Sequence, residues 1–236
     1  MKKLLKFTIR LIFFLALFSV GQVVAFKWLP VWYTPLMVKR SIEFRDDSTY
    51  RFQRHWKNID AISENLIKAS IASEDNLFAT HQGFDIKAIE DELEKSRQTG
   101  KKARGCSTIS QQTAKNVFTL ADRSFLRKGV EAYYTFLIEK IWGKKRIMEV
   151  YLNVAEMGKG IFGAEAAAQA YYKKTASKLT LSESALLVAC YPNPLQRSPA
   201  RPTNYLVKRQ GQITSLVPKL SFKFLEEWKE DKKDGQ

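Results

Sequence analysis

The sequence predicts an all-α protein with a single membrane helix at its N-terminus. An apolar run near the N-terminus is almost long enough to cross a bilayer, and helical spacing of apolar residues dominates from about residue 58 onward. No later stretch shows the β-branched alternation of strands for long. The 236 residues make one ordinary domain or at most a small pair, and 45% hydrophobic residues are enough for a core.

The membrane anchor is predicted over residues 1–33. Four basic residues precede an apolar run over 11–26, and aromatic residues follow at Trp28, Trp32 and Tyr33. A basic cytoplasmic flank and an aromatic belt at the far interface are typical of a single-pass helix. We therefore expect the N-terminus in the cytoplasm and the rest of the chain across the membrane.

A cleaved signal peptide is the main alternative for this segment. Val23-Val24-Ala25 offers the small residue that such a cleavage site requires. The aromatic belt after it favours a retained anchor. A buried core helix fits poorly with the terminal position and the basic flank.

The remaining chain divides into a connector, a helical domain and a tail. Residues 34–57 are mixed and charged and are interpreted as a juxtamembrane connector, 58–222 as the domain, and 223–236 as a charged tail. A turn is expected over 158–163, and Gly143 could break the longest helix. Helices are expected over 58–74, 84–97, 107–117, 124–153, 164–172, 182–189 and 204–216.

The charge balance narrows the class of partner. Lys and Arg number 39 and Asp and Glu 24, a formal net charge of +15 that predicts nucleic acid, an anionic membrane or a phosphate-bearing substrate as partner. Two cysteines and two histidines are too few for a disulfide scaffold or a Cys/His zinc cluster.

An acidic pair ends the first helix of the domain. Glu74 and Asp75 are followed by Phe78, His81 and Gly83. A carboxylate at a helix end, beside an aromatic ring and a glycine turn, suits the rim of a cleft, where partial loss of water raises its pKa toward that of a general base. A solvated acidic pair is the structural alternative.

Two further stretches combine polar and charged side chains. Residues 105–116 contain Ser, Thr and paired Gln, which can hydrogen-bond sugar hydroxyls, although a helix cap with a solvent-facing surface would look the same. In 123–131, three cations precede Glu131. They could hold a pyrophosphate beside that acid, or two of them could form ordinary helix ion pairs with it.

Together these stretches resemble the peptidoglycan glycosyltransferases, glycosyltransferase family fifty-one. The family's E-D-x-x-F-x-x-H-x-G motif matches residues 74–83 at every specified position, and G-G-S-T-I-[TS]-Q-Q followed by K-N matches 105–116, with Cys106 in place of the second glycine. The remaining motifs are R-K-x-x-E at 127–131, K-x-x-I-L-E-x-Y-L-N at 144–153 with Met148 for Leu, and a fifth pattern from Gly163 to Tyr172.

The resemblance implies a lysozyme-like, two-lobed glycosyltransferase domain with one lobe that dips into the membrane. It implies polymerisation of lipid II into glycan strands, with the growing lipid-linked chain as donor and inverting loss of undecaprenyl pyrophosphate. The sequence has no S-x-x-K or K-T-G pattern, so it is similar to the monofunctional members rather than those with a penicillin-binding transpeptidase domain.

The resemblance also assigns residue roles. Glu74 matches the general base that deprotonates the acceptor hydroxyl, and Glu131 matches a second glutamate near the leaving group. Candidates for the pyrophosphate are Lys115, Arg123 and Lys128. Candidate substrate hydrogen-bonders are Ser107, Gln111, Gln112 and Asn116, whereas Lys144, Glu149, Tyr151 and Asn153 are expected to support the fold.

No cofactor is expected to be required. A divalent cation, Mg²⁺ or Mn²⁺, could assist at the pyrophosphate, but the sequence has no D-x-D pair to hold it. Expected partners are lipid II, the growing lipid-linked glycan chain, the membrane and cell-wall synthesis proteins, with no nucleic acid. The expected location is the inner (plasma) membrane, with the domain periplasmic or extracellular.

Two other functions compete with this interpretation. A lysozyme-like enzyme could cleave glycan with Glu74 as general acid, but it would not need the cluster of Lys115, Arg123 and Lys128. A membrane-anchored basic module could bind nucleic acid or anionic lipid, but basic patches with exposed aromatics would then be expected without paired carboxylates.

Arg123 provides a first test. If its guanidinium binds pyrophosphate, Arg123→Ala should lower turnover by more than its effect on melting temperature predicts. Turnover and thermal unfolding of the same preparation are compared with those of the wild type. Equal losses of activity and melting temperature would assign Arg123 a structural role.

Overall fold

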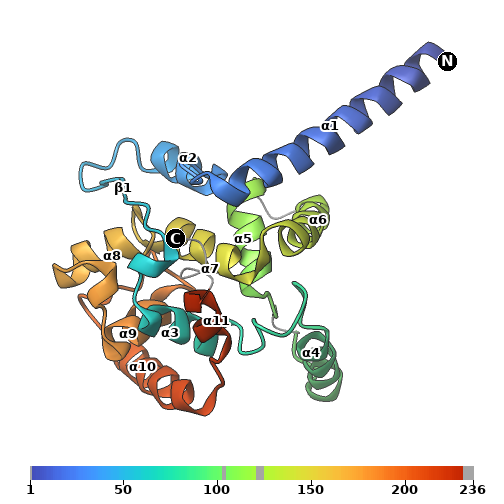
Figure 1. Cartoon of the computed structure of the whole chain (residues 1–236). Helices are drawn as coiled ribbons and strands as arrows, with labels where there is room; N and C mark the ends of the chain where they lie inside the picture. The colour runs from blue at the N-terminus through green and yellow to red at the C-terminus, as the bar shows by residue number, and fades with distance from the viewer. Residues whose placement is uncertain (1, 103–104, 121–124, 231–236) are drawn as a thin grey trace.

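The computed structural model describes residues 2–102, 105–120 and 125–230, and it confirms the all-α class (Figure 1). The helices in the first half are α1 (Lys2–Trp28), α2 (Pro35–Glu43), α3 (Glu64–Glu74), α4 (Ile86–Thr99), α5 (Ile109–Phe118) and α6 (Phe125–Ile141). They are followed by α7 (Gly143–Val154), α8 (Ala164–Tyr172), α9 (Leu181–Cys190), α10 (Asn204–Leu216) and α11 (Phe224–Glu230). Single turns of 3₁₀ helix lie at η1 (Ile59–Ala61), η2 (Ala176–Lys178) and η3 (Val217–Lys219).

The first helix projects away from the rest of the molecule (Figure 1). Its most apolar window has a mean hydropathy of 2.1, and only 11% of that window is buried, so α1 is not a core helix. By length and composition it can cross a membrane once. Its C-terminal half contacts the domain, where Ser19 Oγ lies 2.8 Å from Tyr133 Oη and Trp142 Nε1 donates to the Val23 carbonyl at 2.7 Å.

The domain is built around the buried helix α7. Tyr151, Leu152 and Met148 of α7 are among the largest fully buried side chains. Helix α3 packs on α9 and α10, while α7 contacts α5 and α6 and also α8, so α7 joins two groups of helices. Figure 1 shows α3, α8, α9 and α10 on one side and α4, α5 and α6 on the other.

Helix boundaries follow local sequence signals. Thr108 and Gln111 form a reciprocal capping box at the start of α5, which satisfies backbone donors that the first turn leaves unpaired. Ser63 is the N-cap of α3, and its hydroxyl accepts a hydrogen bond from Asn65 N. Gly143, with φ of 77°, separates α6 from α7 and confirms the predicted break.

Residues 34–57 carry little periodic signal, yet part of this segment folds onto the domain. Helix α2 begins after Thr34, whose hydroxyl caps Met37 N at 3.2 Å, and it packs against α5. Strand β1 (Gln53–Arg54) pairs in parallel with β3 (Ile161–Phe162), and β3 pairs antiparallel with β2 (Glu156–Gly158). The expected turn over 158–163 is therefore a hairpin inside a three-stranded sheet of very short strands.

The segment interpreted as a charged tail also contains structure. Residues 224–230 form α11, and Leu225 is 4% exposed against the core. The Trp228 carbonyl accepts a hydrogen bond from the Lys145 ammonium. A helix of seven residues is too short for its apolar spacing to stand out in the sequence.

The motif over 144–153 supports the fold at most of its positions, as expected. Asn153 exchanges hydrogen bonds with the backbone of Lys57, each at 2.8 Å, and Glu149 accepts from Ile59 N at 2.8 Å. These contacts fasten the segment before α3 to α7. The ion-pair partner of Glu149 is Arg146, not the neighbouring lysine that helix spacing alone would also allow.

Gly83 is held in the left-handed region with φ of 93°, and a Cβ there would lie 2.8 Å from Thr135 Cγ2. Gly83→Ala should therefore lower the free energy of unfolding by about 2 kcal/mol through backbone strain and overpacking. Gly129→Ala is the matched control, because Gly129 lies in α6 with no neighbouring atom within 4 Å of its Cβ position. It should be neutral or slightly stabilising. Thermal unfolding of both variants in the same detergent makes the comparison, and equal melting temperatures would contradict it.

Candidate active site

Glu74 is the last residue of α3 and borders a cavity of about 380 Å³. Its Oε2 accepts a hydrogen bond from Gln112 Nε2 of α5 at 3.0 Å. Its Oε1 accepts a longer hydrogen bond, of 3.4 Å, from the Ser73 hydroxyl, and the side chain is partly exposed at the cavity. The cavity is lined by Ser73, Glu74, Asp75, Asn76, Asp85, Ala88, Gly105, Cys106, Ser107, Thr108 and Gln112.

Asp75 fixes the end of α3 against the start of α5. Its buried carboxylate accepts from Ile109 N at 2.9 Å and from His81 Nε2 at 2.9 and 3.0 Å. His81 Nδ1 accepts from Gly83 N at 3.0 Å, so in the neutral ring Nε2 carries the proton that it donates to Asp75. A carboxylate at a helix N-terminus is favourable, and this network sets the position of Glu74 relative to Gln112.

Glu131 lies on α6 and is only 2% exposed. Arg127 Nη1 binds its Oε2 at 2.6 Å, and the Lys128 ammonium binds its Oε1. Both ion pairs expected from helix spacing are therefore formed at once. Two cations on one buried carboxylate leave a net positive group, which can attract an anion.

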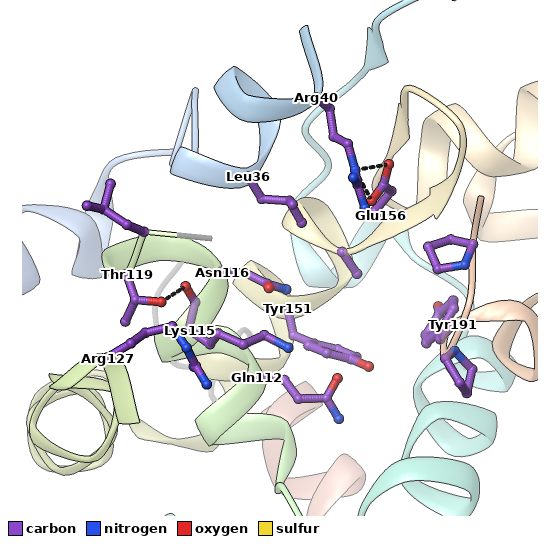
Figure 2. Close-up of a pocket in the computed structure, with 14 residues that line it drawn as sticks. Leu36, Arg40, Gln112, Lys115, Asn116, Thr119, Arg127, Tyr151, Glu156 and Tyr191 are labelled. Carbon is purple, nitrogen blue, oxygen red and sulfur yellow. Dashed lines mark hydrogen bonds and ion pairs between the residues drawn. The ribbon is translucent and has the colours of Figure 1, made fainter. Parts of the chain in front are cut away.

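A second cavity, of about 480 Å³, lies beside the first and shares Gln112 with it. Figure 2 shows Lys115, Asn116 and Gln112 of α5 together with Arg127 of α6 around this space. Its wall comprises Leu36, Arg40, Gln112, Lys115, Asn116, Thr119, Leu120, Arg127, Tyr151, Ala155, Glu156, Tyr191, Pro192 and Pro194.

Lys115 connects the two carboxylates electrostatically. Although it keeps exposed surface, the surrounding cavity walls remove part of its hydration, and this lowers the pKa of its ammonium. The negative charge of Glu131, and less strongly that of Glu74, raises the pKa of Lys115. The positive charges of Arg127 and Lys128 lower it further. The carboxylates of Glu74 and Glu131, which the motifs single out, therefore both influence the pKa of the Lys115 ammonium.

The structure brings most of the predicted site residues to these cavities. Ser107 borders the smaller cavity, Lys115 and Asn116 the larger one, and Gln112 both. Glu131 and Lys128 are bound to each other and line neither cavity, although half of the Lys128 side chain is exposed. Gln111 is not brought to either cavity: it is 4% exposed, and its amide oxygen accepts from Thr108 N in the capping box. Arg123 lies outside the described residues.

Cys106 stands where the family motif has a glycine, and its backbone is not in the left-handed region. Among the described residues other than glycine, Lys173 alone has a positive φ, so Cys106 lies in a region open to any residue. Its Sγ lies 3.5 Å from the Ala88 carbonyl, and burial, aided by Glu92 and Asp85, raises the pKa of the thiol. The thiols of Cys106 and Cys190 are not joined in a disulfide.

The sequence did not reveal several residues of the larger cavity. Arg40 of α2 binds Glu156 of β2 through Nε, at 3.1 and 2.9 Å, although 116 positions separate them. Burial raises the pKa of Glu156, and Arg40 counteracts it. Tyr191, after α9, and Tyr151, expected only to support the fold, also line the wall, and burial together with Glu74 raises the pKa of both hydroxyls.

Comparison with known proteins places this arrangement in one family. Residues 42–217 match the family model described as Transglycosylase. A biosynthetic peptidoglycan transglycosylase of Bacteroides thetaiotaomicron is 47% identical over 237 residues, covering 99% of this chain and 94% of the relative. Proteins with the same description from Shigella boydii serotype 4 and Escherichia coli O1:K1 are each 46% identical over 210 residues, 88% of this chain and 87% of the relative.

The electrostatic link through Lys115 is open to direct measurement. After reductive ¹³C-methylation, the Lys115 signal, assigned by its loss in Lys115→Arg, should titrate below the ordinary lysine pKa of about 10.4. Glu131→Gln removes the carboxylate that raises this pKa, so Lys115 should titrate lower still. A pKa at or above the ordinary value, or an upward shift in Glu131→Gln, would contradict the placement of Lys115 in this cavity.

Proposed function

The chain belongs to the transglycosylase family, whose domain is lysozyme-like, and we propose that it polymerises lipid II into the glycan strands of peptidoglycan. The observation that carries the proposal is the pair of adjoining cavities. One is bordered by the Glu74 carboxylate and the other by the Lys115 and Arg127 cations, with Gln112 between them. Acid–base chemistry on one side and anion binding on the other are what sugar transfer from a pyrophosphate requires.

Glu74 is proposed as the general base. The acceptor sugar would enter the smaller cavity, and the Glu74 carboxylate would take the proton of its attacking hydroxyl. Hydrogen bonds from Gln112 to one carboxylate oxygen and from the Ser73 hydroxyl to the other would orient the carboxylate at the border of this cavity. The hydroxyl oxygen then bonds to the donor's anomeric carbon as the bond to pyrophosphate breaks, with inversion.

The cations of the larger cavity are proposed to bind the leaving pyrophosphate. Lys115 and Arg127 line this cavity, and Arg123 and Lys128 are kept as further candidates. Fixed positive groups stabilise the negative charge that develops as the bond breaks. Glu131 serves this step by holding Arg127 and Lys128 in place, since both are bound to its carboxylate.

No cofactor is required in this proposal. Mg²⁺ or Mn²⁺ could assist by binding pyrophosphate oxygens. Within residues 2–102, 105–120 and 125–230, no group of three His, Cys, Asp or Glu side chains is placed to hold a metal ion.

The first helix supports a membrane location for this reaction. We propose that α1 anchors the chain in the inner membrane, with its N-terminus cytoplasmic and the domain on the periplasmic or extracellular side. Both substrates are lipid-linked, so an anchored domain meets them at a raised effective concentration. Cell-wall synthesis proteins remain predicted partners.

Glycan cleavage is the alternative that keeps the same general fold. It would use Glu74 as a general acid and would leave the cations of the larger cavity without a role. Purified protein given preformed glycan strands should not shorten them. Shortening of the strands without polymer formation from lipid II would replace the proposed function.

Glu74→Gln tests the base directly. It preserves the side-chain shape but removes the proton acceptor, so polymer formation from purified lipid II should fall by about 10²-fold or more, with little change in melting temperature. Glu90→Gln is the matched control, because it neutralises an exposed glutamate of α4 and should retain full activity. Normal polymerisation by Glu74→Gln would reject the assignment.

A further inference from the structure

A third cavity, of about 340 Å³, lies outside the candidate active site. It combines two indoles, three basic side chains and one carboxylate in the segment between α1 and α3 and on α8. Neither the transfer reaction nor the family motifs assign it a role. Its lining residues are Trp32, Arg54, His55, Trp56, Lys57, Glu165 and Gln169.

Arg54 is the central feature of this cavity. The central carbon of its guanidinium lies 5.3 Å from the centroid of the Trp32 ring and 5.4 Å from that of the Trp56 ring. One terminal nitrogen donates to the Val31 carbonyl, while the buried Nε has no hydrogen-bond partner. In the part of the chain that the structure describes, no carboxylate lies within ion-pair distance of Arg54. A half-buried guanidinium without a carboxylate partner is costly, and its partial burial lowers its pKa accordingly.

Glu165, the carboxylate in the same cavity, is bound elsewhere. Its Oε2 accepts from Ala176 N at 2.8 Å, and its Oε1 accepts from Gln169 Nε2 at 2.7 Å and lies 4.0 Å from the Lys57 ammonium. These contacts fix the carboxylate at the start of η2 and beside Lys57. The Arg54 charge is therefore left without a carboxylate partner in this cavity.

The cavity lies where the membrane helix enters the domain. Trp32 follows the end of α1 by four positions, and Trp28 and Tyr33 beside it are exposed. Arg146 donates to the carbonyls of Phe26 and Leu29 and also lies 5.1 Å from the Trp56 ring, which joins this site to the last turn of the anchor. Exposed tryptophan and tyrosine at the end of a spanning helix are typical of the lipid headgroup region.

We propose that this cavity binds the phosphate of an anionic membrane phospholipid. The free guanidinium edge of Arg54 would donate to phosphate oxygens and gain the counter-charge that it lacks, with His55 and Lys57 at the rim. The indoles of Trp32 and Trp56 would pack against the glycerol and the adjoining apolar chain. This inference rests on the membrane location proposed above, but not on the transfer reaction.

Binding can be measured on the full chain, freed of lipid in a neutral detergent. It is titrated with dihexanoyl phosphatidylglycerol, dihexanoyl phosphatidylcholine and inorganic phosphate, and complexes are counted by native mass spectrometry. One saturable phosphatidylglycerol per chain is expected, with phosphatidylcholine and inorganic phosphate about tenfold weaker or more. Equal binding of inorganic phosphate would overturn the lipid assignment, and no saturable phosphatidylglycerol would overturn the site.

Substitutions of the cavity residues test whether phosphatidylglycerol binds at this site. Arg54→Gln should weaken phosphatidylglycerol binding about tenfold or more. If Arg54→Gln does not fold, the double variant His55→Gln/Lys57→Gln, which keeps the stacked guanidinium, should still weaken binding several-fold. Lys208→Gln, which removes one exposed charge on α10, is the matched control and should bind as the wild type does. Unchanged binding in every folded cavity variant would reject the proposal.

Polymer formation from lipid II is recorded on the same preparations. Lipid binding without polymer formation by the wild type would count against the proposed function alone. Polymer formation without saturable phosphatidylglycerol binding would count against the lipid site alone.

Discussion

The buried carboxylate of Asp75 holds together the parts on which the candidate active site depends. It accepts from the first N–H of α5 and from His81, and His81 in turn accepts from Gly83 N. Thr108 closes the same region, since its hydroxyl donates to the Gly83 carbonyl at 2.7 Å. Because Glu74 precedes Asp75 and Gln112 follows three positions after Ile109, this one buried group sets the direction of the Glu74 carboxylate. Much of the first motif therefore positions its glutamate rather than meeting the substrate.

Charge is arranged differently at the two ends of the site. Glu74 receives neutral hydrogen bonds from Gln112 and from the Ser73 hydroxyl. Glu131 is bound by Arg127 and Lys128, so its carboxylate is paired with two cations. Lys115 lies in the field of both carboxylates, and its charge state responds to each. The same residue type thus has two roles, which its surroundings determine.

Local signals explain most of what the sequence predicted correctly. The break at Gly143, the Thr108 cap and the pairing of Glu131 with cations three and four positions before it all follow from neighbours in the chain. Contacts between residues far apart in the sequence, such as the ion pair of Arg40 with Glu156, could not be predicted from local patterns. Gln111 shows a second limit: it looks like a ligand for sugars, but its amide completes a capping box. The roles of Glu74, Lys115 and Arg123 toward substrate remain predictions.

The contacts between the anchor and the domain have a mechanical consequence. Ser19 meets Tyr133 on α6, and the Val23 carbonyl accepts from Trp142 between α6 and α7. Both contacts lie in the C-terminal half of α1 and fasten this helix to the domain. With α1 in the membrane as proposed, they would hold the tilt of the domain and the height of its cavities above the bilayer constant. An elongating product would then leave the molecule along a fixed direction, while the whole body diffuses laterally as one unit.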